Sequence, residues 1–95
     1  MKLRRSARAN REFAQAADYL IEQNPAAARG FAAAIELALR NIQEHPKIGT
    51  VTNAGSGQYR QYTLSNYPYK IFYRLESETI FIISIFHTAQ DPGKI

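Results

Sequence analysis

The chain changes character at Pro46. Before this proline, apolar residues recur every three or four positions among many alanines, which is the spacing of one helix face. After it, β-branched and aromatic residues dominate, as they do in strands. Helices that come first and strands that come second favour an α+β domain, in which the helices pack on one face of an antiparallel sheet.

The length and composition restrict the kind of site that the chain can build. We predict one domain over residues 1–95, because a single core is viable at this size without metal or disulfide support. The sequence has no cysteine, which excludes a disulfide framework and a thiolate metal site. Its two histidines, His45 and His87, are 42 positions apart and do not by themselves make a ligand cluster.

The charge balance leaves the class of partner open. Twelve Lys and Arg against eight Asp and Glu give a net charge of +4, which permits a nucleic-acid or an acidic protein partner. No apolar run approaches the roughly eighteen residues of a membrane span. The basic N-terminus is not followed by the apolar segment of a signal peptide. We therefore expect a cytoplasmic protein.

The N-terminal half begins with a short strand and a helix. Residues 1–5 can form an edge strand, with Leu3 turned inward and the cations outward. Ser6 is a good helix N-cap, because its hydroxyl can accept a hydrogen bond from an unpaired N–H of the following turn. We predict a helix over residues 7–23. Its expected apolar face consists of Phe13, Ala16, Ala17, Leu20 and Ile21.

Asn24 and Pro25 end this helix and start a second one. Asn24 is expected to cap the second helix, and Pro25 suits its first position, where an N–H would have no helical partner. The helix is predicted over residues 25–45, since Pro46 disfavours helical geometry in the residue before it. So short a join predicts an antiparallel helical hairpin. The expected apolar face consists of Phe31, Ile35, Ala38, Leu39 and Ile42.

Residues 46–58 are rich in glycine and are predicted to form a loop. The Gly55-Ser56-Gly57 motif could suggest a phosphate-binding loop. Neither the Lys-Ser/Thr pair nor the helix start that such a loop needs follows it, so a flexible connection is the better interpretation.

Three strands are predicted after the loop, at about residues 59–64, 69–75 and 79–87. Their short connections predict an antiparallel meander. The third strand is nearly continuously apolar, as expected of a strand that is covered on both faces. The second strand carries Tyr69, Ile71, Tyr73 and Leu75 on one face and Lys70, Phe72 and Arg74 on the other.

The cations in this apolar region mark a candidate site. If the tyrosines of the second strand face the helices, Lys70 and Arg74 lie on the opposite face with Phe72, and Arg60 joins them if the register allows. A solvated strand face explains these cations as well. Their interleaving with aromatic rings favours a surface that binds protein or nucleic acid. His87 ends the third strand near this face.

His87 could also serve as a general acid or base near neutral pH. No serine, cysteine or paired-carboxylate motif accompanies it. A hydrogen-bonded structural histidine is therefore the better interpretation. His45 is favoured at the C-terminal end of its helix by the helix dipole.

Four short segments, taken in order, resemble one family: EHPKIGT, YRQYTL, YPYKIFYRLE and IISIFHTAQDP. Together with the order of elements they resemble the ParE branch of the RelE/ParE toxin superfamily, over essentially the whole chain. Its members are toxins of bacterial type II toxin–antitoxin modules, often described as plasmid stabilisation proteins. The resemblance implies the fold of that superfamily, with the hairpin packed on the C-terminal sheet.

The superfamily has two activities on one fold, so the fold does not decide the function. ParE-like members inhibit DNA gyrase, and RelE-like members are ribosome-dependent endoribonucleases. The resemblance places Gln61 and Thr63 where the ribonucleases have paired lysines, Lys70 at their next basic residue, Thr88 at an arginine and Lys94 near a tyrosine. We therefore favour gyrase inhibition and predict no catalytic residue. A RelE-like ribonuclease and a decayed toxin that only binds antitoxin are the alternatives.

Two positions depart from the ParE pattern: Gln90 replaces an arginine common before the Asp-Pro pair, and Arg5 replaces an apolar strand residue. The resemblance implies a cognate antitoxin whose C-terminal segment folds on binding, wraps the hairpin and can add a strand or helix to the sheet. It also implies gyrase as target, and operator DNA contacted only through the antitoxin. No cofactor, metal, membrane or small-molecule substrate is expected. The predicted partner-binding residues are Arg60, Lys70, Arg74 and His87.

Overall fold

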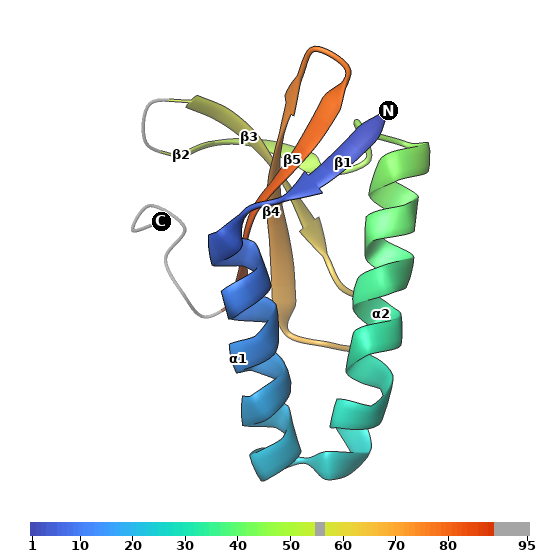
Figure 1. The fold of residues 1–95 in the computed structure, drawn as a ribbon, viewed down its shortest axis with the longest axis vertical. Helices are drawn as coiled ribbons and strands as arrows, with labels where there is room; N and C mark the ends of the chain where they lie inside the picture. The colour runs from blue at the N-terminus through green and yellow to red at the C-terminus, as the bar shows by residue number, and fades with distance from the viewer. Residues whose placement is uncertain (55–56, 89–95) are drawn as a thin grey trace.

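A short strand, two helices and four further strands follow one another in the computed structural model, which describes residues 1–54 and 57–88. Figure 1 shows both helices on the same side of one sheet. The predicted α+β class is confirmed. The elements are β1 (Lys2–Arg5), α1 (Ala7–Gln23), α2 (Pro25–Glu44), β2 (Thr50–Ala54), β3 (Gly57–Thr63), β4 (Tyr69–Glu76) and β5 (Thr79–His87).

The first helix begins as predicted. Ser6 caps α1, because its Oγ accepts a hydrogen bond from the Ala9 N–H at 2.9 Å. Ala9 and Ala16 are buried against the core. Ile21 is predicted to share this apolar face, and that prediction is wrong, since the residue is 57% exposed. Figure 1 shows the reason: the tip of the hairpin extends past the end of the sheet, so the last turn of α1 has no strand beneath it.

The second helix also begins as predicted. Asn24 Oδ1 accepts a hydrogen bond from the Ala27 N–H at 3.2 Å, and Pro25 lies at the start of the helix. The helix ends at Glu44, one residue earlier than predicted, because His45 has already left helical geometry at φ −133° and ψ 77°. None of the described helices is long and apolar enough to cross a membrane.

The core lies between the hairpin and the sheet. All five residues predicted for the apolar face of α2 are buried. Opposite them, β4 and β5 contribute Tyr69, Ile71, Tyr73, Ile80, Ile82 and Ile85. Removing this apolar surface from water is the main contribution to the stability of the fold.

Among the described residues, the sheet has five strands in the order β1-β5-β4-β3-β2. β1 runs parallel to β5, and the other neighbouring strands are antiparallel, so the predicted meander is β3–β4–β5. The predicted edge strand is confirmed as β1, with Leu3 packed against the core.

The strand β2 is a correction to the sequence prediction. Residues 46–58 are predicted as a loop, but Thr50–Ala54 pair antiparallel with β3. The glycines and the asparagine that predict a loop flank a run of β-branched residues too short to stand out, and pairing with β3 makes it a strand. Gly55 and Ser56 lie outside the described residues, and Gly57 begins β3.

A bulge interrupts the alternation of β5. Tyr73 pairs with Ile82 and Phe72 pairs with Ser84, which leaves Ile83 as an additional residue. The bulge lets the isoleucines of β5 face the helices both before and after it, although their spacing in the sequence is irregular.

Candidate functional site

We call the face of the sheet turned away from the helices the open face. In β4, Tyr69, Ile71 and Tyr73 belong to the core beneath the helices. Successive side chains of a strand point to opposite faces, so the residues between them belong to the open face. The predicted division of β4 therefore holds, and the open face receives Lys70, Phe72 and Arg74.

Lys70 lies half-buried on the open face. Its Nζ donates a hydrogen bond to Gln61 Oε1 at 3.3 Å. Its neighbours across the sheet are Thr63 on β3 and Phe86 on β5. Since an ammonium group has three N–H donors, one bond to a neutral amide leaves Lys70 able to bind an anionic group as well.

Arg74 is held by an aromatic ring and a carboxylate. Its guanidinium lies 5.7 Å from the centroid of Phe81, and its Nη2 is 2.9 Å from Glu76 Oε2. Its Nε is buried and has no hydrogen-bond partner within the described part of the chain. Arg4 on β1 pairs with Phe81 from the other side. Two arginines therefore flank one phenylalanine across three strands of the open face.

The aromatic rings of the open face pack against one another. The Phe72 ring lies 4.9 Å from Tyr59 and 5.9 Å from Phe86, centroid to centroid. Phe72 is only 2% exposed and Phe86 only 4%. Stacking of nucleic-acid bases needs accessible ring faces. The open face therefore presents cations above a layer of packed, buried rings. Such a surface suits an acidic protein partner better than a single nucleic-acid strand.

Arg60 lies on the opposite side of the sheet from the two cations of β4. It pairs with Tyr73, whose ring is in the helix-side core. Its Nη1 donates hydrogen bonds to Lys47 O at 3.1 Å and to Gly49 O at 2.9 Å. The register thus separates Arg60 from Lys70, and its guanidinium closes the loop that follows α2.

Tyr73 fixes the same loop from beneath. Its hydroxyl donates to Pro46 O at 2.8 Å and accepts from the Gly49 N–H at 2.9 Å. A Cβ on Gly49 would lie 2.7 Å from Tyr73 Oη and 2.8 Å from Gln61 O, so only glycine fits there. Burial raises the pKa of Tyr73, although the Gly49 N–H and the charge of Arg60 act in the other direction. The EHPKIGT segment is therefore a structural anchor.

His87 lies on the helix side of β5, away from the open face. It pairs with Tyr69, and the two rings meet edge to face with centroids 5.4 Å apart. The four predicted partner-binding residues thus occupy three separate places. Lys70 and Arg74 share the open face, Arg60 holds the loop, and His87 lies near α1. Contact of each with a partner stays a prediction.

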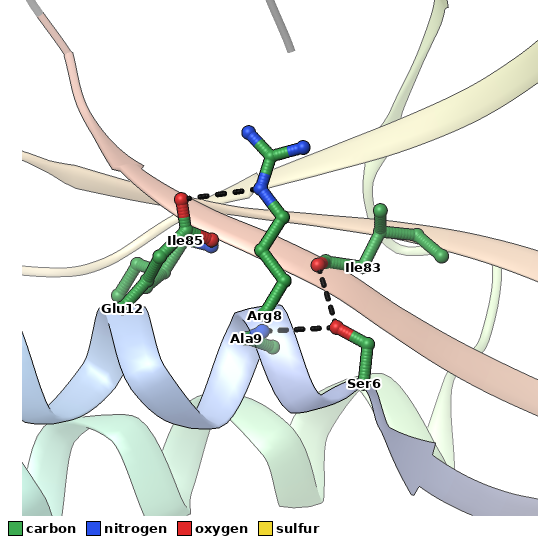
Figure 2. Close-up of polar contacts among 6 residues, drawn as sticks. All are labelled: Ser6, Arg8, Ala9, Glu12, Ile83 and Ile85. Atoms are coloured by element: carbon green, nitrogen blue, oxygen red, sulfur yellow. Dashed lines mark hydrogen bonds and ion pairs between the residues drawn. The ribbon is translucent and has the colours of Figure 1, made fainter.

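A groove of about 460 Å³ separates α1 from the end of β5, and we call it the α1–β5 groove. Glu12 lies in it and joins the two elements, as Figure 2 shows. Its Oε1 accepts from the Ile85 N–H at 3.3 Å, and its Oε2 accepts from Arg8 Nε at 3.4 Å. The residues lining the groove include Gln15, Ala16 and Tyr19 from α1 and Tyr69, Ile85 and His87 from the sheet.

Sequence reasoning misses this groove. The only local signal is the spacing of Arg8 and Glu12, four residues apart on one helix, which predicts an ion pair and nothing about a strand. Among the described residues, no three His, Cys, Asp or Glu side chains are grouped as metal ligands would be.

The chain matches the family model described as "ParE toxin of type II toxin-antitoxin system, parDE" over residues 3–92. This chain belongs to the ParE toxin family. Its structure is similar to a chain from the "Chromosomal ParDE TA system from P. aeruginosa", with a TM-score of 0.77 and 19% sequence identity. The match covers 92% of this chain and 95% of that chain. No curated protein matches it in sequence.

Gln61 and Thr63, which the resemblance places at the paired lysines of the ribonucleases, lie together on the open face beside Lys70. Gln61 is hydrogen-bonded to Lys70, and Thr63 pairs with Lys70 across β3 and β4. Thr88 uses its backbone N–H to bind Pro68 O at 2.8 Å. Lys70 therefore has a neutral amide and a neutral hydroxyl beside it. Lys94, the remaining position of this comparison, and Gln90, which departs from the ParE pattern, lie outside the described residues.

Proposed function

We propose that this ParE-family toxin binds DNA gyrase in the cytoplasm and blocks it, and that a cognate antitoxin neutralises the toxin by binding to it. The observation that carries the proposal is the surroundings of Lys70. Gln61 and Thr63 stand beside it where the ribonucleases that the chain resembles have lysines. Family membership over residues 3–92 supports the same branch.

The chemistry of RNA cleavage gives the physical reason. Without a metal, cleavage needs cations that stabilise charge on the scissile phosphate and a group that moves the proton of the 2′-hydroxyl. Loss of a single charge-stabilising donor typically lowers kcat by about 10²–10³-fold. Lys70 supplies one cation, and its neighbours on β3 are uncharged. Such a surface supports binding rather than hydrolysis.

The open face offers the electrostatics for binding. Lys70 and Arg74 are held in place by Gln61 and Phe81, and Arg4 adds a third cation along the same face. Acidic side chains on gyrase or on the antitoxin would complement this charge and accelerate association. We propose that operator DNA is reached only through the antitoxin.

The test is a supercoiling assay with purified gyrase and purified toxin. The wild-type protein is expected to inhibit supercoiling or to trap cleaved DNA. The double variant Lys70→Glu/Arg74→Glu is expected to need at least about ten times more protein for the same effect. The matched control Arg29→Glu/Lys47→Glu changes the net charge equally at exposed positions of α2 and the following loop, and should behave as wild type.

Other outcomes point to the alternatives. If the wild-type toxin leaves gyrase untouched, primer extension on translated message tests ribonuclease activity, and codon-phased cuts that Lys70→Ala abolishes would establish it. Normal growth after induction without antitoxin, together with an inactive gyrase assay, would indicate a decayed toxin that only binds its antitoxin.

A further inference from the structure

Cations are concentrated at the start of the chain. Five lie within the first eleven residues: Lys2, Arg4, Arg5, Arg8 and Arg11. Arg5 is neutralised, because its Nη2 lies 3.0 Å from Glu36 Oε1. Lys2 and Arg4 are exposed, and within the described part of the chain neither of them forms an ion pair. Their charges are therefore available to a partner.

The side chains of Lys2 and Arg4 belong to the open face. Leu3, which lies between them, packs against the core, and successive side chains of a strand point to opposite faces. Arg4 pairs with Phe81, which pairs with Arg74 on its other side. Neighbouring strands are about 4.8 Å apart, so the backbones of the two arginines are about 10 Å apart, and Lys2 lies about 7 Å from Arg4 along β1. The cations thus extend inward from the edge of the sheet, where Figure 1 shows β1 beside β5.

The open face has an excess of positive charge. Among the described strands, alternation assigns the following charged side chains to this face: Lys2, Arg4, Lys70, Arg74 and Glu76. Glu76 is paired with Arg74, and Glu78 lies outside the strands in the turn between β4 and β5. Lys70 and Arg74 are four residues apart on β4, which is about 13 Å. A DNA duplex carries one charge per about 1.7 Å of its axis, so several phosphates fall within this length.

Strongly exposed apolar side chains lie elsewhere on the described part of the molecule. They are Met1, Tyr19, Ile21, Leu37, Ile48 and Val51. Four of them belong to the helices or to the loop after α2. Val51 is opposite Arg60 on the helix side, and Met1 O accepts a hydrogen bond from Gln43 of α2. A protein interface usually has an apolar centre, whereas a phosphate backbone needs only cations. The open face therefore suits a phosphate backbone.

The buried rings decide between the two forms of nucleic acid. Phe72 and Phe86 are only 2% and 4% exposed, so they cannot stack on the bases of a single strand. In a duplex the bases are already stacked on one another, and the phosphates form the outer surface. The observations therefore favour a duplex.

We propose that the open face contacts the phosphate backbone of the DNA duplex that gyrase holds, through Lys2, Arg4, Lys70 and Arg74. This inference rests on the proposed gyrase target and adds the DNA of the gyrase complex as a second component of that target. Phosphate contacts carry no sequence information, so the contact is independent of base sequence and does not select operator DNA.

The first experiment measures the affinity of labelled toxin for purified gyrase, with and without a bound DNA duplex. Wild type is expected to bind gyrase with DNA at least about ten times more tightly than gyrase alone. Lys2→Gln/Arg4→Gln should lose most of this gain, while its affinity for DNA-free gyrase stays within about twofold of wild type. The matched control Arg29→Gln/Arg40→Gln removes two exposed arginines of α2 and should keep the gain. Both double variants should unfold at the same urea concentration as wild type, because all four side chains are exposed.

The second experiment measures direct binding of the toxin to a short duplex of arbitrary sequence as the salt concentration changes. Each phosphate contact adds about 0.9 to the slope of log affinity against log salt. With about three contacts, the affinity of wild type should fall about 40-fold between about 50 and 200 mM salt. The affinity of Lys2→Gln/Arg4→Gln, with two contacts fewer, should fall only about 3.5-fold over the same range. A duplex of unrelated sequence should bind equally well.

The outcomes separate the two levels of inference. Wild-type toxin that binds gyrase equally with and without DNA, or that does not bind the duplex at low salt, overturns the DNA contact and leaves the proposed gyrase target standing. Wild-type toxin that binds gyrase in neither form overturns both. If Lys2→Gln/Arg4→Gln weakens binding to DNA-free gyrase as much as binding to the DNA complex, these cations contact the gyrase protein instead, and the DNA contact is wrong.

Discussion

The two faces of the sheet are both buried at their centres, but in different ways. On the helix side, Ile71 and Tyr73 lie under two helices among aliphatic side chains. On the open face, Phe72 is equally buried, and the described rings in contact with it are Tyr59 and Phe86.

Substitutions on the two faces should therefore have different effects: on the helix side they should change stability, and on the open face they should change binding. The helix side holds the core cluster that joins both helices to the sheet, so a change there affects folding. The open face carries Lys70 and Arg74 on its rings, with charged ends near the surface. A change in these cations should affect binding and leave the fold almost unchanged.

The largest expected effect comes from neighbouring residues of β4 that point to opposite faces. Ile71→Ala should lower the free energy of unfolding by about 2–5 kcal/mol, because it leaves a cavity in the helix-side core. Lys70→Ala should change it by less than about 1 kcal/mol and yet weaken partner binding. Urea denaturation of both variants is the measurement. Equal destabilisation by the two would end the distinction between the faces.

A smaller decrease in the free energy of unfolding is expected from Tyr73→Phe. The variant keeps the ring in the core but removes the hydroxyl that joins Pro46 O and the Gly49 N–H. Leaving buried polar groups without a partner costs about 1–3 kcal/mol in the free energy of unfolding. Thermal and urea denaturation measure it, with Tyr19→Phe as a control on an exposed tyrosine. Identical stability of Tyr73→Phe and wild type would show that the loop needs no anchor.

Ionisation of the same tyrosine should lower the stability of the fold at alkaline pH. Burial raises the pKa of Tyr73 above the ordinary tyrosine value of 10.0, so the folded state keeps the proton to higher pH than the unfolded state. The contribution of protonated Tyr73 to the free energy of unfolding is fully present below pH 10.0. It is lost as the pH rises through the pKa of Tyr73 in the folded state.

Urea denaturation as a function of pH tests this prediction. The fall in stability on the alkaline side should be shallower in Tyr73→Phe than in wild type. A residual fall is expected in the variant, because burial, with help from Tyr19, also raises the pKa of Tyr69. Curves of the same steepness would mean that Tyr73 ionises as readily in the folded state as in the unfolded chain.

The smallest effect on stability is expected from Arg74→Ala. Its guanidinium is partly exposed, and its ion pair with Glu76 and its contact with Phe81 are each worth about 1 kcal/mol or less. The variant should unfold almost as wild type does and inhibit gyrase less. A loss of several kcal/mol in denaturation would instead place Arg74 among the residues that hold the open face together.

Local signals were sufficient for much of the fold. Ser6 and the Asn24-Pro25 pair mark the helix starts, because a cap depends on residues within one turn of it. The two faces of β4 follow from alternation alone. Alternation therefore also predicts that Lys70 and Arg74 share one face of the sheet.

Other features depend on partners far along the chain. Residues 50–54 become β2 because β3 lies beside them. Ile21 is exposed on the last turn of α1, at the end of the hairpin that extends past the sheet. The side on which Arg60 lies depends on the register between β3 and β4. Ring-to-ring and cation-to-ring distances on the open face likewise depend on which strands are neighbours.

The sequence by itself determined both helices with their caps, the order of every described strand except β2, the alternating faces of β4 and the resemblance to the ParE family. Only the tertiary structure decided that Arg60 and His87 lie apart from Lys70 and Arg74, and that α1 occupies the edge of β5 through Glu12. The physical reason is the distance along the chain over which each interaction acts. Caps and alternation act over a few residues, whereas register and strand order result from contacts between segments that are as much as 77 residues apart, as Ser6 and Ile83 are.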